Sequence, residues 1–334
     1  MFLKITHLKF LFFFILLFQF KASAQCFEIE SILVDACETE GNEGQNEMVR
    51  FKIGPTAQNT SNLTVNWPSN SWLGVIQNAS TATKVANMNQ MILAAGGCGT
   101  ILEPVNGVLP ANATVVLVTS HLFDINLNPF GAITENIYII FQNSTVLGGH
   151  FGNYGTSATR TLSMNFGNSC SDTVTYNRSL LVNANGVQQA ANGATVNFTS
   201  SGNATYSNNG CTAPVSVLLL EAGPNPQPVC TGETITLSGQ AQGVQNITWS
   251  APSGSFSTGN SLTTTYTPAN NATGSVVITL TGINACGTTI TDTLTVTIQN
   301  GVTPTFTFSN LTICPGETAP VLNTTSQNGI TGTW

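Results

Sequence analysis

Residues 276–298, VVITLTGINACGTTITDTLTVTI, decide the fold class of this chain. Val276–Thr281 and Thr291–Ile298 are rich in Thr, Val and Ile and mostly alternate apolar with polar residues, which is typical of strands half-buried in a sheet. The Gly and Asn residues between the two runs predict a turn. Three similar runs precede them: Thr234–Leu237, Val244–Trp249 and Leu262–Thr267. The pattern predicts an all-β domain.

A repeat marks the limits of this domain. The segment Val229–Thr234, VCTGET, returns 84 residues later as Ile313–Thr318, ICPGET. Trp249 and Trp334 follow the two copies at similar distances. This period suits one β-sandwich module of about 100 residues. The second copy reaches only Trp334, so residues 301–334 are predicted to be the truncated start of a further repeat in a longer protein.

The composition excludes some classes of function. Only 7% of the 334 residues are charged, against about 25% in ordinary globular domains. Polarity comes from 48 Thr and 36 Asn residues instead. Eight Lys and Arg residues in the whole chain are too few for a surface that binds nucleic-acid phosphates. We therefore expect no nucleic-acid partner.

Residues 1–24 have the pattern of a cleaved signal peptide. Lys4 and Lys9 precede the apolar run Phe10–Phe18, and Ala22–Ala24 supplies a small-x-small cleavage site. The alternative, a membrane anchor, is disfavoured because nine apolar residues are far fewer than the roughly 20 that span a bilayer. Gln25 before Cys26 also disfavours a lipoprotein. We expect a chain that is secreted or held on the outer cell surface, with no membrane span.

All eight cysteines follow the predicted cleavage site: Cys26, Cys37, Cys98, Cys170, Cys211, Cys230, Cys286 and Cys314. Disulfides are the expected state of exported thiols, and no CxxC pair favours a metal site. We predict Cys230–Cys286 across the module at residues 216–300, near Trp249. Cys170–Cys211 and Cys37–Cys98 are predicted in the first domain, although sequence alone leaves the connectivity open.

Cys26 and Cys37 are not expected to pair with each other. They bracket a predicted strand of about nine residues, and at about 3.3 Å per residue its ends lie about 30 Å apart. A disulfide requires Cα atoms within about 7 Å.

The region 25–215 is predicted to be a separate domain, followed by the Pro-rich segment Gly223–Pro228 as a linker or turn. Its predicted strands are Phe27–Val34, Met48–Ile53, Thr114–Val118, Ile137–Phe141, Thr173–Tyr176 and Thr195–Phe198. Residues 83–95 predict one helix, because Val85, Met88, Ile92 and neighbours recur at helical spacing. Thr81 or Thr83 is expected to cap the start of this helix, and Gly96 to end it.

Several segments resemble known families. Glu28–Asp35, the acidic loop after it and Asn46–Phe51 resemble the opening of lamin-tail domains, as do Leu109–Thr114 and Asp172–Tyr176 later. This resemblance implies an immunoglobulin-like β-sandwich, here with a short inserted helix.

The later part of the chain has a second resemblance. Residues 216–300, and the start of the next repeat, resemble the PKD-like and immunoglobulin-like repeats of large proteins secreted by gliding bacteria. That resemblance implies export by type IX secretion and a role in cell adhesion or gliding motility. The expected fold class is all-β, with tandem immunoglobulin-like sandwiches.

An acidic loop is the strongest candidate for a metal site. Its carboxylates are Asp35, Glu38, Glu40, Glu43 and Glu47. Ca²⁺ binds six to eight oxygens from flexible loops, and Gly41 and Gly44 provide flexibility. We predict that no cofactor is required and that calcium is the one candidate. The alternative is a solvated acidic loop.

Trp67 and Trp72 flank Pro68 and are a candidate sugar-stacking platform; the alternative is that they pack a loop onto the sandwich.

His121 and His150 lack the sequence context of a nucleophilic or zinc site, and His150 is expected in a turn. No catalytic residue is predicted. We therefore expect a non-catalytic adhesin or scaffold whose partner is an extracellular polysaccharide or protein. The alternative is the accessory region of a hydrolase whose catalytic domain lies beyond Trp334.

Overall fold

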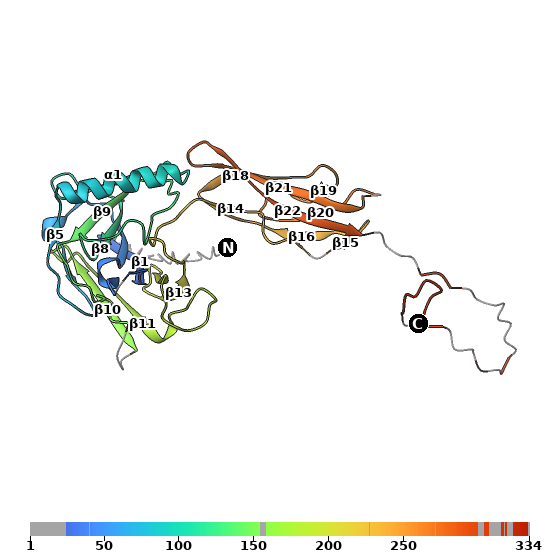
Figure 1. Cartoon of the computed structure of the whole chain (residues 1–334), viewed down its shortest axis with the longest axis horizontal. Helices are drawn as coiled ribbons and strands as arrows, with labels where there is room; N and C mark the ends of the chain where they lie inside the picture. Colours follow the sequence, from blue (N-terminus) through green and yellow to red (C-terminus); the bar gives the residue numbers. More distant parts are fainter. Residues whose placement is uncertain are drawn as a thin grey trace, which may run out of the picture. The chain divides into compact units, whose positions relative to one another are not determined.

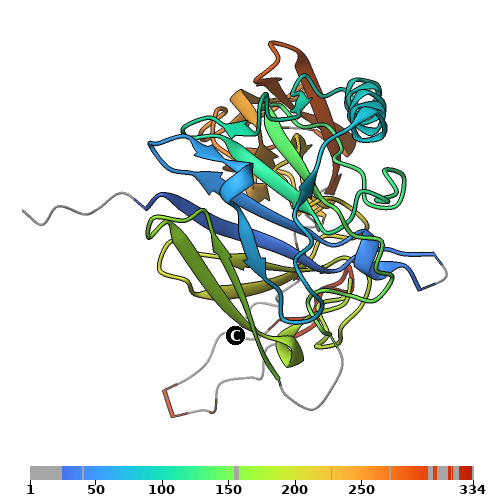
Figure 2. The same ribbon diagram turned by 90° about the vertical axis from the view of Figure 1, so that its left-hand side faces the viewer.

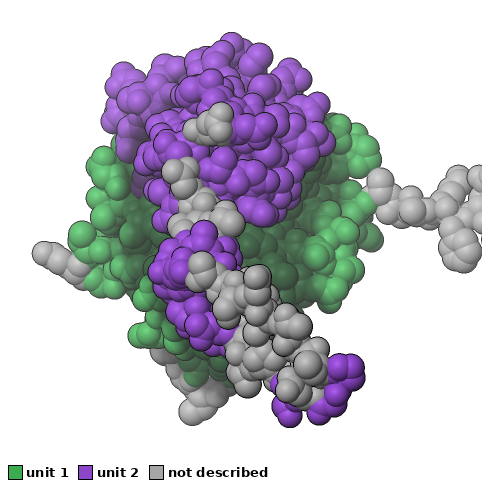
Figure 3. Space-filling model, turned by 90° about the vertical axis from the view of Figure 1, so that its right-hand side faces the viewer, with its two compact units in different colours: residues 1–85, 101–128, 137–214 green, residues 86–100, 129–136, 215–334 purple. Residues whose placement is uncertain are grey.

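The computed structural model describes residues 25–39, 41–153, 158–226, 228–270, 272–299, 304–306, 315–316, 318 and 323–332. The predicted signal peptide, Glu40, Cys314 and Trp334 lie outside the described residues. The chain divides into two units, which Figure 3 colours separately. Unit 1 comprises residues 1–85, 101–128 and 137–214, and unit 2 comprises residues 86–100, 129–136 and 215–334. Unit 2 thus takes in two short segments that the sequence pattern assigns to the first domain.

The larger sheet of unit 1 has eight strands, in the order β13-β12-β1-β2-β8-β9-β5 with β6 on β9. Figure 1 labels β1, β5, β8, β9 and β13 of this sheet. They are β1 (Phe27–Asp35), β2 (Met48–Ile53), β5 (Val75–Ile76), β6 (Ile101–Leu102), β8 (Thr114–Val118), β9 (Ile137–Gln142), β12 (Ala194–Phe198) and β13 (Ala204–Asn208). β8 pairs with β2 on one side and with β9 on the other. All five of its residues are buried, because a central strand is covered on both faces.

A three-stranded sheet, in the order β11-β10-β4, forms the second layer of unit 1. Its strands are β4 (Thr64–Asn66), β10 (Thr159–Asn165) and β11 (Ser171–Asn177), and Figure 2 shows β10 beside β11. Leu162, Met164, Val174 and Tyr176 point inward and join the core of β1 and β2. The short pair β3 (Gln58–Asn59) and β7 (Val108–Leu109) and the 3₁₀ turns η1 (Glu43–Gln45), η2 (Thr60–Asn62) and η3 (Arg178–Leu180) complete unit 1.

The predicted helix is α1 (Ala79–Ala94). Its cap differs from the prediction: the Asn78 side chain accepts hydrogen bonds from the N–H groups of Ser80 and Thr81. The Thr81 hydroxyl accepts the N–H of Asn78 in return, which forms a reciprocal cap. Gly96 ends the helix with a φ of +86°, as expected. Among the described residues, no helix has the length and apolar character needed to cross a bilayer.

Unit 2 contains a β-sandwich. One sheet has the order β15-β22-β21-β18, the other β16-β20-β19, and β14 pairs with β17 beside them. The strands are β14 (Leu219–Glu221), β15 (Val229–Cys230), β16 (Ile235–Ser238), β17 (Gln240–Gln242), β18 (Val244–Ser250), β19 (Ser255–Phe256), β20 (Thr263–Thr267), β21 (Gly274–Asn284) and β22 (Thr289–Gln299). Trp249 and Tyr266 lie in its core. The all-β, immunoglobulin-like class is confirmed.

The three predicted disulfide pairings are wrong. The structure pairs Cys26 with Cys170, Cys37 with Cys211, and Cys98 with Cys286. The expectation that Cys26 and Cys37 do not pair with each other is confirmed. Among the described cysteines, Cys230 is free and exposed.

The sheet order of unit 1 explains two of these pairings. Asp35 pairs with Ala194, which pairs in turn with Asn208, so Cys37 and Cys211 both follow the same corner of the sheet. Cys26 precedes β1 and Cys170 precedes β11, and the Ile29 N–H donates to Asp172 of β11. Neither proximity follows from spacing along the chain.

The predicted Cys230–Cys286 pair fails on distance. Cys230 lies opposite Gln299, the last residue of β22, whereas Cys286 lies in the turn before the first residue of that strand. β22 has 11 residues, and a strand of that length spans about 35 Å. Cys286 instead bonds Cys98, in the segment of unit 2 that follows α1.

Candidate binding site

The structure divides the acidic loop into an outer and an inner part. Glu38 is exposed, and its carboxylate accepts the N–H of Glu43 within the loop. Asp35, Glu43 and Glu47 are partly or fully buried, and burial raises the pKa of each. Glu40 lies outside the described residues. The loop is therefore not simply a solvated surface, because its inner carboxylates are withdrawn from water.

Glu47 is the deepest of these acids, with a side chain that is 0% exposed. One carboxylate oxygen accepts the backbone N–H of His150 at 2.6 Å, and the other accepts the N–H of Phe151 at 3.3 Å. Burial raises the pKa of Glu47 to about 8, although these two N–H donors oppose the rise. Removal from water destabilises the charged carboxylate more than these two hydrogen bonds stabilise it.

Glu43 converges on the same place. A Cβ added at Gly149 would lie 2.9 Å from Glu47 Oε1 and 3.4 Å from Glu43 Oε2, so both carboxylates approach this glycine closely. Asn153 donates one amide hydrogen bond to Glu43 and another to the carbonyl of Val34. The pKa of Glu43 is raised to about 8, mainly by burial and secondly by the negative charge of Glu47. A residue larger than glycine at position 149 would require the buried Glu47 carboxylate to shift.

His150 connects Glu47 to a chain of buried polar groups. Its Nδ1 lies 3.3 Å from Glu47 Oε2, and its Nε2 lies 3.0 Å from the amide nitrogen of Gln142. The indole N–H of Trp67 donates to Gln142 Oε1 at 2.7 Å. Because an indole nitrogen only donates, this bond fixes the orientation of the Gln142 amide. His150 Nε2 is therefore an acceptor, and Nδ1 carries the proton that faces Glu47.

The backbone bends at Gly148, His150 and Phe151, which agrees with the expected turn, while the His150 side chain is buried within the network. Burial lowers its pKa to about 4, so the ring is neutral at pH 7. With the side chains of Glu47 and His150 both 0% exposed, the pair has no open face for a substrate. A buried hydrogen-bond network of this kind orients its members and specifies the core.

The predicted calcium ligands are only partly brought together. Within the part of the chain that the structure describes, no group of three or more His, Cys, Asp and Glu side chains has the arrangement of a metal site. Two of the predicted ligands, Glu43 and Glu47, do converge, while Glu38 faces solvent. Calcium stays a prediction of the sequence.

The predicted aromatic platform is wrong for Trp67. Its side chain belongs to the core, with 5% of the residue exposed, and contacts His150 and Phe151 edge to face. Trp72 packs against it with ring centroids 6.5 Å apart. The alternative interpretation, that these rings hold a loop on the sandwich, matches the structure.

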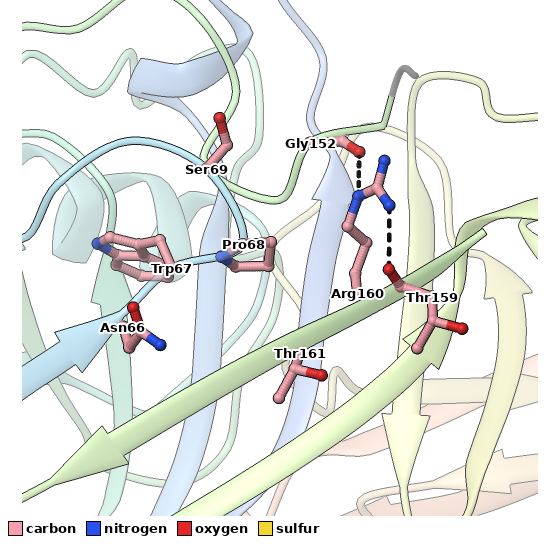
Figure 4. A pocket seen from close by; sticks show the side chains of 8 residues that line it. All are labelled: Asn66, Trp67, Pro68, Ser69, Gly152, Thr159, Arg160 and Thr161. Carbon is pink, nitrogen blue, oxygen red and sulfur yellow. Dashed lines mark hydrogen bonds between the residues drawn. The ribbon is translucent and has the colours of Figure 1, made fainter. Parts of the chain in front are cut away.

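A polar groove lies beside these rings (Figure 4). Its volume is about 420 Å³, and its lining is Asn66, Trp67, Pro68, Ser69, Gly152, Thr159, Arg160 and Thr161. Arg160 donates to the carbonyls of Gly152, at 2.6 Å, and of Thr159, at 3.0 Å. The guanidinium is therefore held in place, and the hydroxyl and amide groups around it can donate or accept hydrogen bonds. A volume of this size lies in the range of small-ligand sites.

Sequence reasoning missed most of these residues. Gln142, His150 and Asn153 lie about a hundred residues from the acidic loop, and no local motif joins them to it. The groove likewise combines residues 66–69 with residues 152–161. The pairing of β4 with β10 and the hydrogen bond from the Ser69 N–H to the His150 carbonyl bring these segments together.

Comparisons with known proteins give little more. No protein-family model matches the chain, and no curated protein matches it. A solution structure of the PKD domain from KIAA 1837 protein is similar over 28% of this chain and 97% of that domain, at 20% identity and a TM-score of 0.23.

A second similar structure is the Bacteroides ovatus mixed-linkage glucan utilization locus protein SGBP-B in complex with a mixed-linkage heptasaccharide. The similarity covers 51% of this chain and 54% of that protein, at 14% identity and a TM-score of 0.18. The chain thus matches about half of that protein's length.

Proposed function

We propose that this protein is a non-catalytic adhesin or scaffold, exported to the cell surface or beyond, that binds polysaccharide through unit 1. Export through the signal peptide and type IX secretion, the lamin-tail relationship and the role in adhesion or gliding belong to this proposal. The groove lined by Arg160, Asn66 and Thr161 is the observation that carries it.

The covalent structure supports an extracellular role. Three disulfides close loops with separations of 144, 174 and 188 residues. Such bonds persist in oxidising environments and are rare in the cytosol. They stabilise a chain that has few ion pairs to do so, since 7% of its residues are charged.

The groove supports binding rather than chemistry. Its hydrogen-bonding groups are hydroxyls, one amide and a guanidinium, which suit the many hydroxyls of a sugar. Pro68 supplies apolar surface for the C–H groups of a sugar ring (Figure 4). The buried acids Glu43 and Glu47 are not among the lining residues, so the groove has no carboxylate pair for glycoside hydrolysis.

Affinity electrophoresis tests this function. The full chain should be retarded in gels containing a soluble polysaccharide, and we expect retention by at least one of hydroxyethylcellulose, dextran and soluble starch. The polysaccharide should keep its length after incubation with the chain. Unchanged migration in every gel, or cleavage of a probe, would count against the proposal.

Calcium is tested separately. If Ca²⁺ binds at Glu43 and Glu47, addition of about 1 mM, the range of extracellular calcium modules, should raise the thermal midpoint at pH 8. The ion would hold both carboxylates in their charged form. The rise should be lost in Glu43→Gln and kept in Glu38→Gln, whose carboxylate is exposed. Equal midpoints with and without Ca²⁺ would remove calcium from the proposal.

A further inference from the structure

We propose that the outer face of the sheet β11-β10-β4 is the docking surface for an uncharged polysaccharide. This inference rests on the proposed function and adds the location of the site and the class of glycan. We call this surface the hydroxyl face. Its residues are Thr64, Asn66, Thr159, Thr161, Ser163, Asn165, Ser171, Thr173 and Thr175.

The strand period creates this face. Successive side chains of a strand point to opposite sides. The inward set on β10 and β11 is buried at Leu162, Met164, Val174 and Tyr176, and it has the half-buried Arg160 and Asp172 near the strand ends. Each residue of the outward set is exposed except Ser163, which is half-buried. Every outward side chain is Thr, Ser or Asn, so the face is polar throughout and carries no charge.

Register sets the hydroxyls opposite one another. Thr161 pairs with Thr175, and Ser163 with Thr173. The two threonine hydroxyls of the first pair lie 3.1 Å apart, and Thr173 donates to Ser163 at 2.9 Å. A hydroxyl donates once and accepts twice. Each pair therefore keeps one O–H donor and several lone pairs for a ligand, which suits the hydroxyls of a sugar.

These hydroxyls are also preorganised. Threonine is stiff at χ1 because of its branched Cβ, and the hydrogen bonds across the strands restrict the hydroxyls further. Ordering flexible side chains is one of the main costs of association. A face already ordered avoids much of that cost, while the threonine methyl groups offer apolar contact to the C–H groups of a sugar.

The hydroxyl face continues into the groove. Asn66, Thr159 and Thr161 belong to both, and Figure 4 shows Thr161 on the strand that leads away from Arg160. A chain of sugars on the face can therefore extend into the groove. The occupant is thus an extended polymer rather than a single sugar.

Charge decides between classes of polymer. A polyanion is recognised by clustered Lys and Arg, whereas the hydroxyl face has none and the whole protein has a formal net charge of −7. Arg160 is the one charged residue in the groove lining, and it already donates to two backbone carbonyls. An uncharged polysaccharide meets no repulsion here and exchanges hydrogen bonds with water for equivalent bonds with the protein.

The test uses the full chain, affinity electrophoresis and five polymers: hydroxyethylcellulose, dextran, soluble starch, alginate and heparin. For the uncharged polymer that binds best, the double variant Thr161→Val and Thr175→Val should bind about tenfold more weakly, as expected for two lost hydroxyl contacts. Thr161→Ser with Thr175→Ser should retain binding. The matched control is Thr291→Val with Thr293→Val, which alters two exposed strand threonines of unit 2. An unchanged thermal midpoint verifies folding.

The salt dependence of binding distinguishes charged from uncharged polysaccharides. Binding to the uncharged polymer should be unaffected between about 50 and 500 mM NaCl, because screening acts only on charge. Binding only to alginate or heparin, lost at high salt, would overturn the inference and leave polysaccharide binding intact. Undiminished binding by the folded valine variant would overturn the location alone. Binding to none of the five polymers would overturn both this inference and the proposed function.

Discussion

Between pH 6.5 and pH 8, the metal-free chain should lose stability as the pH rises. In the folded protein the pKa of Glu43 and of Glu47 is about 8, against an ordinary value of 4.5. Over this interval the folded state therefore binds more protons than the unfolded state, and stability falls with pH. Each such carboxylate contributes about 1.4 kcal/mol per pH unit.

The lower limit of this window is set by His150. Its pKa falls from 6.5 to about 4 on folding, so between these values the unfolded state binds the extra proton, and this group makes stability rise with pH. Asp35, whose pKa rises to about 6, acts in the same direction as Glu43 and Glu47 but below pH 6. Above pH 6.5, among these four groups, only Glu43 and Glu47 still bind different numbers of protons in the folded and unfolded states.

Glu47→Gln isolates the contribution of Glu47 to this effect. The amide keeps the shape of the carboxyl group and an oxygen that accepts the His150 N–H, but it does not ionise. The fall in unfolding free energy from pH 6.5 to pH 8 should shrink by about 2 kcal/mol, measured by urea unfolding in EDTA. Glu38→Gln, in the same loop but exposed, should leave the fall unchanged. An identical pH dependence in Glu47→Gln and the parent would exclude a protonated Glu47 in the folded state.

Loss of the Cys37–Cys211 disulfide should have the second large effect. Its cysteines are 174 residues apart, and the bond ties the end of β1 to the segment after β13. Removing a native disulfide typically costs about 2–5 kcal/mol, because the unfolded chain regains freedom. The double variant Cys37→Ser with Cys211→Ser should lower the stability of unit 1 by that amount, measured by denaturant unfolding followed through Trp67 and Trp72 fluorescence.

Cys230→Ser is the matched control for this variant. Cys230 is exposed and outside the three disulfides, so its replacement should leave stability as it is. Complete reduction of the parent chain should lower its stability at least as much as the double serine variant, because it opens all three disulfides. If the double variant unfolds at the same denaturant concentration as the parent, the bond does not contribute to stability.

Local pattern predicts the elements of this fold well. Met48–Ile53 and Thr114–Val118 are strands with the bounds expected from sequence, because their apolar periodicity reflects burial directly. The helix was predicted for the same reason, but its cap lies at Asn78. Asn and Thr both cap helices, so composition alone does not choose between neighbouring candidates.

Long-range features could not be predicted from one sequence. The disulfides depend on sheet order, which joins Cys37 to Cys211 through three strands. The Glu47–His150 contact joins residues 103 apart, and no periodicity encodes such a distance. The hydroxyl face depends on the register of β10 with β11, since a slip of one residue would send these hydroxyls into the core.

The overlapping disulfides also determine how this protein would respond to being pulled. Cys26–Cys170, Cys37–Cys211 and Cys98–Cys286 are interleaved, so every residue from Cys26 to Cys286 lies inside at least one closed covalent loop. Tension on the two ends would pass through sulfur–sulfur bonds and could draw out only a minor part of the polypeptide. A tether built this way would stay short under load even after its sheets had separated.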